Sequence, residues 1–81
     1  MRLHYTDRFL KDYAQAPLSI QRAFDRKAAF LTANILHPSL RAKKYNEADG
    51  TWQARVTDNW RFYFKIEGDI YYLLRLIPHP K

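Results

Sequence analysis

Three arginines in the second half of the chain have a spacing that suggests chemistry. Arg55, Arg61 and Arg75 each occupy an outward position in a segment where polar and apolar residues alternate. If these segments are neighbouring strands of one sheet, alternation places all three guanidinium groups on the same face. Like charges on adjacent strands repel one another unless an anion lies between them. The planar fork of arginine donates two parallel hydrogen bonds to phosphate oxygens, so the pattern favours a phosphodiester ligand.

Other side chains at outward positions of the same segments also suit a nucleic acid. Tyrosines among the cations can stack on bases, and two consecutive lysines extend the positive strip along its edge. A single outward arginine is usually just a solvated surface residue, so the clustering is what favours a ligand. The predicted RNA-binding positions on this face are Lys43, Lys44, Gln53, Tyr63, Lys65 and Tyr71.

His79 follows Arg75 by four residues, between two prolines. An imidazole titrates near pH ~6.5, so it can give or take a proton at neutral pH. His79 is therefore a candidate general acid or base, and the alternative is an idle histidine near the C-terminus. The histidines lie far apart without metal-binding spacing, so the sequence predicts no metal and no other cofactor. The chain has two glycines and no cysteine, which excludes a glycine-rich phosphate loop and thiolate chemistry.

The elements that must position these residues follow from hydrophobic periodicity. Residues 2–5 alternate and predict a short strand with Leu3 and Tyr5 inward. Helical spacing predicts one helix from residue 7 to about 16 and a second from 18 to about 36. After Leu40 the period becomes two, which predicts a short basic strand and then three strands joined by tight turns. These later strands are expected at residues 41–45, 52–57, 60–66 and 70–77.

The predicted architecture is α+β. An N-terminal strand and two helices precede a three- to four-stranded antiparallel meander, and the helices pack on one sheet face, because neither element can bury its apolar side alone. At 81 residues the whole chain, 1–81, is expected to form a single domain. The face under the helices is predicted to carry Trp52, Ala54, Val56, Phe62, Phe64, Ile66, Tyr72, Leu74 and Leu76.

The composition agrees with a folded, basic protein. About 47% of the residues are hydrophobic and 16% are aromatic, which is enough for a packed core. Fourteen Lys and Arg against eight Asp and Glu give a net charge of +6, which favours a polyanion first and an acidic protein segment second. The N-terminus becomes charged before any apolar run forms, and no apolar run is long enough to cross a bilayer. A cytoplasmic protein with no membrane partner is therefore expected.

The meander also resembles a known family. The order of elements, with the runs Lys43-Lys44-Tyr45, Trp52-Gln53-Ala54-Arg55-Val56 and Asn59-Trp60-Arg61-Phe62-Tyr63-Phe64, resembles the RelE/ParE superfamily of bacterial toxins. The ending Leu74-Arg75-Leu76-Ile77-Pro78-His79 is similar to the YafQ-like branch, in which an arginine and a histidine four apart serve the active site. Gln53 departs from the pattern, since RelE has a lysine there, and so does Asn59, where the YafQ-like pattern has an acid.

This resemblance implies the toxin of a type II toxin–antitoxin pair. Such toxins are mRNA interferases that cut messenger RNA in the ribosomal A site and are neutralised by a cognate antitoxin. The implied reaction needs no metal: a ribose 2′-OH attacks the adjacent phosphate and leaves a 2′,3′-cyclic phosphate and a 5′-OH. Carried over by position, Arg61 and Arg75 would hold the scissile phosphate and Arg55 would assist. His79 would act as general acid or base, and Trp60 would contact a base.

Two other interpretations remain open at the level of the sequence. A ParE-like toxin would inhibit DNA gyrase by binding protein and would need no catalytic residues. A non-catalytic member of the family would only bind its partner. In every case an antitoxin is expected to lay a helix or an extended segment over the sheet face or the helix pair, with acidic residues against the basic surface.

Overall fold

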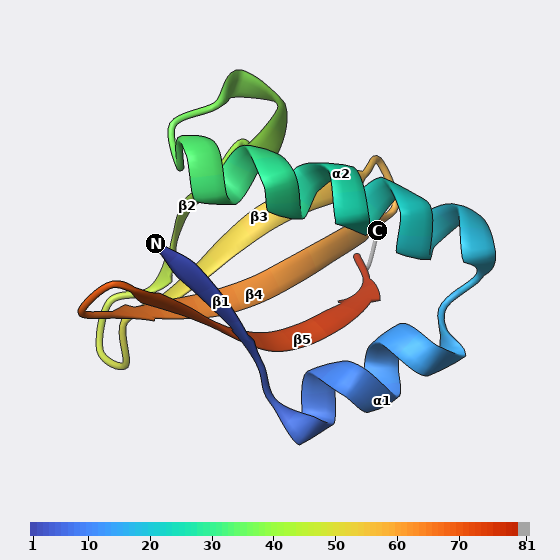
Figure 1. The fold of residues 1–81 in the computed structure, drawn as a ribbon, viewed down its shortest axis with the longest axis horizontal. Coiled ribbons are helices and arrows are strands. Elements are labelled where there is room, and N and C mark those ends of the chain that lie inside the picture. The colour runs from blue at the N-terminus through green and yellow to red at the C-terminus, as the bar shows by residue number, and fades with distance from the viewer. Residues whose placement is uncertain (80–81) are drawn as a thin grey trace.

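The computed structural model describes residues 1–79 of the chain, arranged as one sheet and two main helices (Figure 1). The α+β architecture predicted from the sequence is confirmed. The elements in chain order are β1 (Arg2–Tyr5), α1 (Asp7–Gln15), α2 (Leu18–Ala33), a short 3₁₀ helix η1 (Pro38–Leu40), β2 (Lys43–Asn46), β3 (Thr51–Thr57), β4 (Trp60–Glu67) and β5 (Ile70–Pro78).

The sheet has five strands in the order β1-β5-β4-β3-β2. Strands β2 to β5 form the predicted antiparallel meander. The N-terminal strand β1 joins this sheet beside β5 and runs parallel to it, so the sheet is mixed (Figure 1). The first and last strands of the chain are therefore neighbours, and the first strand leads directly into α1.

Helix α2 crosses the sheet over β3 and β4, and α1 lies beside β5 (Figure 1). The contact between α2 and the sheet is aromatic: the Phe24 ring meets the Phe62 ring edge-on, with 5.2 Å between their centroids. Phe9 of α1 packs against Phe24 from the other side, at 4.9 Å. Helix α2 ends at Ala33, earlier than expected, because the Asn34 side chain accepts a hydrogen bond from the Leu36 N–H and favours a turn.

Helix α1 is fixed to β5 at both ends of its contact. The Thr6 hydroxyl donates to the Leu73 carbonyl (2.7 Å) and accepts from the Phe9 N–H (3.2 Å), so one side chain caps the helix and ties it to the sheet. Six residues later, Asp12 accepts a hydrogen bond from the Leu76 N–H (3.0 Å), beyond the last residue of β5 that pairs with β1. Helix α1 thus covers the stretch of the β5 edge that β1 leaves open.

A β-bulge in β5 changes which side chains face the helices. Tyr63 of β4 lies opposite Arg75, but the next residue, Phe64, lies opposite Leu73, so Leu74 is an extra residue in β5. One extra residue reverses the inward and outward alternation on one side of the bulge. Alternation after the bulge therefore matches the sequence prediction, and alternation before it does not.

The inward prediction for the first half of β5 was wrong for this reason. Tyr71 is 4% exposed and packs edge-on against Phe64 in the core, whereas it was expected on the outward face. Tyr72 and Leu74, expected inside, are only half-buried, and Leu73 is buried in their place. Of the other predicted inward residues, Ala54, Val56, Phe62, Phe64 and Leu76 are buried, which confirms them. Trp52 is half-buried against the core, and the inward prediction was wrong for Ile66 and Tyr5, which are exposed near the ends of their strands.

Candidate active site

The register of the sheet decides which predicted site residues share a face. Arg55 of β3 lies directly opposite Arg61 of β4, and Gln53 lies directly opposite Tyr63. Tyr63 in turn lies opposite Arg75 of β5. Side chains of directly opposed residues point to the same side of a sheet. The three arginines therefore originate on one face, the one turned away from α2, as their alternation predicts.

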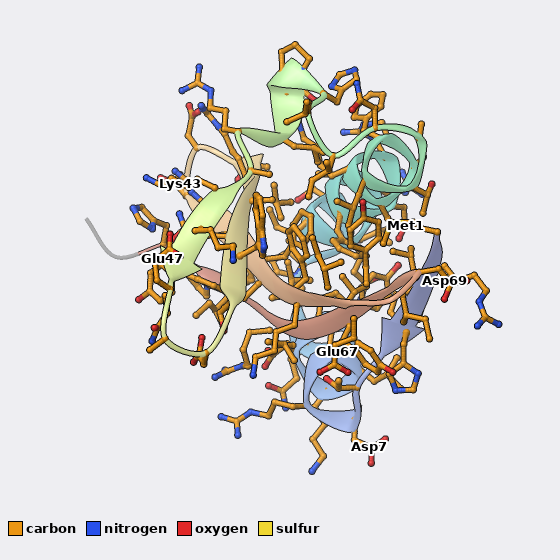
Figure 2. The ribbon with its side chains drawn as sticks, turned by 90° about the vertical axis from the view of Figure 1, so that its left-hand side faces the viewer. Met1, Asp7, Lys43, Glu47, Glu67 and Asp69 are labelled. Atoms are coloured by element: carbon orange, nitrogen blue, oxygen red, sulfur yellow. The ribbon has the colours of Figure 1, made fainter. Side chains whose placement is uncertain are left out.

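Part of this face is hollowed into a basic pocket of about 260 Å³, lined by Arg41, Lys43, Gln53, Arg55, Arg61 and His79. Among residues 1–79, no carboxylate lines it. The His79 backbone N–H donates to the Asn59 carbonyl (2.6 Å), which holds the residue after β5 against the turn between β3 and β4. Figure 2 shows nitrogen-tipped side chains gathered around Lys43 at the β2 edge. The structure thus places the imidazole beside two of the three predicted arginines.

The Arg61 guanidinium is oriented by the backbone and not by an acid. Its Nη1 group donates to the carbonyl oxygens of Thr57 (2.6 Å) and Trp60 (2.9 Å). Among residues 1–79 it forms no ion pair, and its Nε and Nη2 groups have no hydrogen-bond partner. The positive charge is therefore held rigidly at the pocket and is not neutralised by the described part of the protein. Such an arginine can receive an anion without first losing a partner.

Arg55 has a partner that an anion can displace. It forms an ion pair with Asp58, three residues later in the turn between β3 and β4. The Asp58 side chain is 80% exposed, so the pair is strongly solvated. Exposed pairs of this kind contribute only about 0–1 kcal/mol. Asp58 therefore balances the Arg55 charge in the free protein without blocking a phosphate.

Arg75 does not line the basic pocket, so the structure does not bring all three predicted arginines together there. Its Nε–H donates to Asp12 Oδ2 at 2.7 Å, so the guanidinium is drawn toward α1. Its side chain instead lines a neighbouring groove of about 310 Å³ with Tyr45, Tyr63, Thr51, Leu74 and Ile77. Periodicity could not show this pairing, because Asp12 lies on a different element and 63 residues away.

Of the predicted RNA-binding residues, Lys43, Gln53 and Tyr63 lie at or next to the pocket. Lys43 is opposite Gln53. Gln53 is only 9% exposed, and its side chain forms no hydrogen bond with another described residue, so its amide is available to a ligand in the pocket. Tyr63 meets Tyr45 edge-on, with 5.0 Å between ring centroids, in the aromatic groove beside the pocket.

The other four predicted RNA-binding residues lie elsewhere. Lys44 is opposite Trp52 on the other face, and its ammonium lies 5.6 Å from that ring. Trp60 is half-buried against the core, and Tyr71 is inside it. Lys65 is opposite Tyr72 and lines neither the pocket nor the groove. Lys44, Lys65 and Trp60 have side chains that suit RNA, but their positions in the sheet keep them out of the basic pocket.

The sequence prediction missed Arg41, which lines the basic pocket. This residue follows η1 and has a left-handed backbone conformation, with φ 46° and ψ 42°. Its side chain reaches the pocket because the backbone reverses there, before β2 begins. The only sequence signal was a cation directly ahead of the basic strand.

Comparisons with known proteins address the fold. No protein-family model matches the sequence, and no curated protein matches it. Solved structures do match. A YoeB/ParE toxin from Agrobacterium tumefaciens superimposes with a TM-score of 0.82 at 15% identity, over 99% of this chain and 100% of that one. YafQ from E. coli strain BL21(DE3) gives 0.79 at 17% identity, over 95% and 91% of the two chains. The chain has the RelE/ParE toxin fold.

The RelE/ParE fold extends over nearly the whole chain in these comparisons. A chain of the toxin–antitoxin complex RelBE2 from Mycobacterium tuberculosis matches 96% of this chain over 96% of its own length, with a TM-score of 0.78 and 22% identity. At identities this low, the matches establish the fold alone. The chemistry of the site must therefore be argued from the side chains of this protein. Neither helix among residues 1–79 combines the length and apolar character needed to span a membrane.

Among the described residues that line the basic pocket, His79 has the side-chain type best suited to exchange a proton. Arginine stays protonated and cannot act as a base. Burial, followed by the neighbouring Tyr45, raises the pKa of Tyr63 above its usual value near 10, although Arg61 opposes the change. Tyr63 is therefore a hydrogen-bond donor at neutral pH. Among the side chains that line the basic pocket, imidazole is the type that ordinarily titrates near neutrality.

Asp12 is expected to make the stability of the protein sensitive to acid. Burial alone would raise the pKa of this carboxyl, but hydrogen bonds from Arg75 and the Leu76 N–H more than offset it and hold the pKa below its usual range. A depressed pKa stabilises the fold above the unfolded value of about 3.9, and this contribution is lost as the pH falls through the folded value. Asp12→Asn should cost about 2 kcal/mol at neutral pH, and the difference should shrink below about pH 4.

Urea unfolding of the wild type and of Asp12→Asn across this range of pH measures the effect. Asp69→Asn is the matched control, because the Asp69 side chain is mostly exposed and only 4.0 Å from an equally exposed Arg2. A constant gap between wild type and Asp12→Asn at all pH values would contradict the assigned role of Asp12.

Proposed function

We propose that this protein is the toxin of a type II toxin–antitoxin pair and cleaves messenger RNA on the ribosome. The observation that supports it most is the basic pocket, where the Arg61 guanidinium has no carboxylate partner among the described residues and lies with His79 around one hollow. A site that only bound protein would not need a proton-exchanging group beside an uncompensated arginine. The RelE/ParE fold adds support, since its neighbours include toxins by name.

The proposed reaction is transfer of a phosphodiester to the neighbouring 2′ oxygen. The 2′-OH loses its proton as its oxygen bonds to phosphorus, and the bond from phosphorus to the 5′ oxygen breaks. The leaving 5′ oxygen takes up a proton, which gives a 2′,3′-cyclic phosphate and a 5′-OH. Arg61, assisted by Arg55, stabilises the charge that builds on the phosphate oxygens. His79 exchanges the proton, and no metal or other cofactor is required.

A cognate antitoxin is the proposed protein partner. The RelB–RelE pair from Methanococcus jannaschii and the YoeB–YefM pair from Staphylococcus aureus were solved as toxin–antitoxin complexes, and the matched chain of each has this fold. The net charge of +6 favours an acidic antitoxin segment. Because ribosomes and messenger RNA are the proposed targets, the protein would act in the cytoplasm.

Induced expression in bacteria tests the proposal. Growth should stop, and primer extension and end analysis should find messenger RNA cut to 2′,3′-cyclic phosphate and 5′-OH ends. Growth arrest with intact messenger RNA and stalled DNA replication would instead support a gyrase inhibitor. An absence of any growth defect would leave a non-catalytic, partner-binding protein. Either result would overturn the nuclease proposal.

His79→Gln should slow cleavage by about 10²-fold, because positioned general acid–base groups typically contribute at least this much. Glutamine preserves hydrogen-bonding capacity but cannot exchange a proton. Binding of a substrate analogue with 2′-O-methyl groups should be unchanged, because the charge of the arginines remains. Single-turnover cleavage on purified ribosomes measures the rate, and His4→Gln, on the exposed first strand, is the control. Equal rates for His79→Gln and the control would exclude His79 from the chemistry.

A further inference from the structure

A second pocket adjoins the basic pocket and is larger, at about 700 Å³. It lies where α2 and η1 meet the end of β3. The two pockets share Arg41 and Arg55, which line both of them. The remaining side chains of the second pocket come from Lys27, Pro38, Ser39, Val56, Thr57 and Asp58.

The second pocket holds more positive charge than its own residues neutralise. Lys27 of α2 is only partly exposed. Its ammonium donates a hydrogen bond to the Ser39 carbonyl (3.1 Å). Burial lowers the pKa of Lys27, and the nearby charges of Arg55 and Arg26 lower it further. Asp58 is the single carboxylate among the described residues that line this pocket, and it is already paired with Arg55. A bound anion would relieve this repulsion.

Arg41 connects the two pockets at the cost of backbone strain. Its φ of 46° lies in the left-handed region, which a residue with a Cβ atom seldom occupies. Among residues 1–79 its side chain has neither an ion pair nor a hydrogen bond. Strained conformations of this kind persist where the surroundings hold a functional side chain in place. Here the strain directs a cation to the boundary between the pockets.

We propose that the second pocket binds a further phosphate of a single-stranded RNA backbone, next to the phosphate held in the basic pocket. This inference rests on the proposed function, because RNA is taken as the ligand. Arg41 and Arg55 would contact both phosphates, and Lys27 would contact only the second. The ligand would then be an oligonucleotide that spans both sites.

RNA fits this surface better than an acidic protein segment does. The aromatic groove with Tyr45 and Tyr63, the basic pocket and the second pocket adjoin in this order through shared or directly opposed residues. A base-stacking site followed by a cationic track is the usual arrangement for single-stranded nucleic acid. The second pocket offers only Pro38 and Val56 as apolar contacts and lacks the aromatic anchor typical of a protein interface.

The test is the salt dependence of RNA binding. A fluorescent single-stranded RNA octamer with 2′-O-methyl groups resists cleavage and reports affinity by anisotropy. Lys27→Met keeps the apolar stem and removes one charge, so affinity should fall roughly five- to tenfold and the slope of log K against log salt should become shallower by about 0.7. Lys27→Arg should retain both values. Lys11→Met, an exposed lysine on α1 outside both pockets, is the matched control.

A second variant guards against loss of folding in Lys27→Met. Asp58 lies in an exposed turn, and Asp58→Asn should free Arg55, tighten octamer binding several-fold and steepen the salt slope. If Lys27→Met keeps the wild-type salt slope, or if neither variant changes the affinity for the octamer, the second phosphate site does not exist. If Lys27→Met weakens binding of a glutamate-rich octapeptide but leaves RNA binding unchanged, the pocket binds protein and the inference is overturned. Intact messenger RNA after induction, with these binding effects present, would refute only the nuclease proposal.

Discussion

Arg61→Ala is expected to slow cleavage of messenger RNA by about 10²–10³-fold while the protein stays folded. The guanidinium is aimed at the basic pocket by backbone carbonyls of the turn between β3 and β4, and no described carboxylate neutralises it. Its charge is therefore available to stabilise the charge that would build on the phosphate in the proposed reaction. The carbonyls that lose Arg61 lie in a solvated turn, so water replaces the lost hydrogen bonds at small cost.

Arg75→Ala is the matched comparison, because both residues are arginines of the same sheet face. Arg75 is bound to Asp12, whose side chain is 13% exposed, and its loss leaves a mostly buried carboxylate without a cation. This variant should lose about 2–3 kcal/mol of stability. Single-turnover cleavage on ribosomes and urea unfolding, measured on both variants, separate the two roles. If Arg61→Ala cleaves at the wild-type rate, or if only Arg61→Ala loses stability, the assignment of a catalytic role to Arg61 and a structural role to Arg75 is refuted.

The alternation of polar and apolar residues predicted the face of each side chain correctly only where the strands pair regularly. Strands β3 and β4 pair without interruption from Trp52 to Arg55, so the common face of Arg55 and Arg61 follows from sequence alone. Strand β5 contains a bulge that no residue type marks, since Leu73 and Leu74 are both apolar. The face of every residue before the bulge was therefore reversed, and Tyr71 entered the core.

Side chains that meet across elements were beyond prediction for a different reason. Asp12 lies on the first helix and Lys27 on the second, and the periodicity of a helix gives its buried stripe but not the strand residue that each position meets. The ion pair of Asp12 with Arg75 and the position of Lys27 beside Arg55 depend on how the helices are placed on the sheet. Arg41 depends on a left-handed backbone conformation that a non-glycine residue rarely adopts.

Phe62→Ala is expected to cost about 3–5 kcal/mol of stability. Phe62 is fully buried, and its ring meets those of Phe24 and Phe64 with centroid distances of 5.2 and 5.7 Å. It is the point where α2 contacts β4, and its neighbours in β4 are Arg61 and Tyr63 on the opposite face. A domain of this size has a total stability toward the low end of the usual ~5–15 kcal/mol, so the loss should leave a large unfolded fraction at 37 °C.

Urea unfolding checks the cost, with Ile66→Ala as the matched control on the same strand and face. Ile66 is exposed at the end of β4, so its truncation should cost far less. Because Phe62→Ala leaves Arg61 and His79 unchanged, the variant should recover most of its cleavage rate when it is cooled below its unfolding transition. Arg61→Ala should stay slow at every temperature. A cooled, folded Phe62→Ala protein that remains inactive would mean that the ring does more than hold β4 in place, and that the pocket depends directly on its packing against α2.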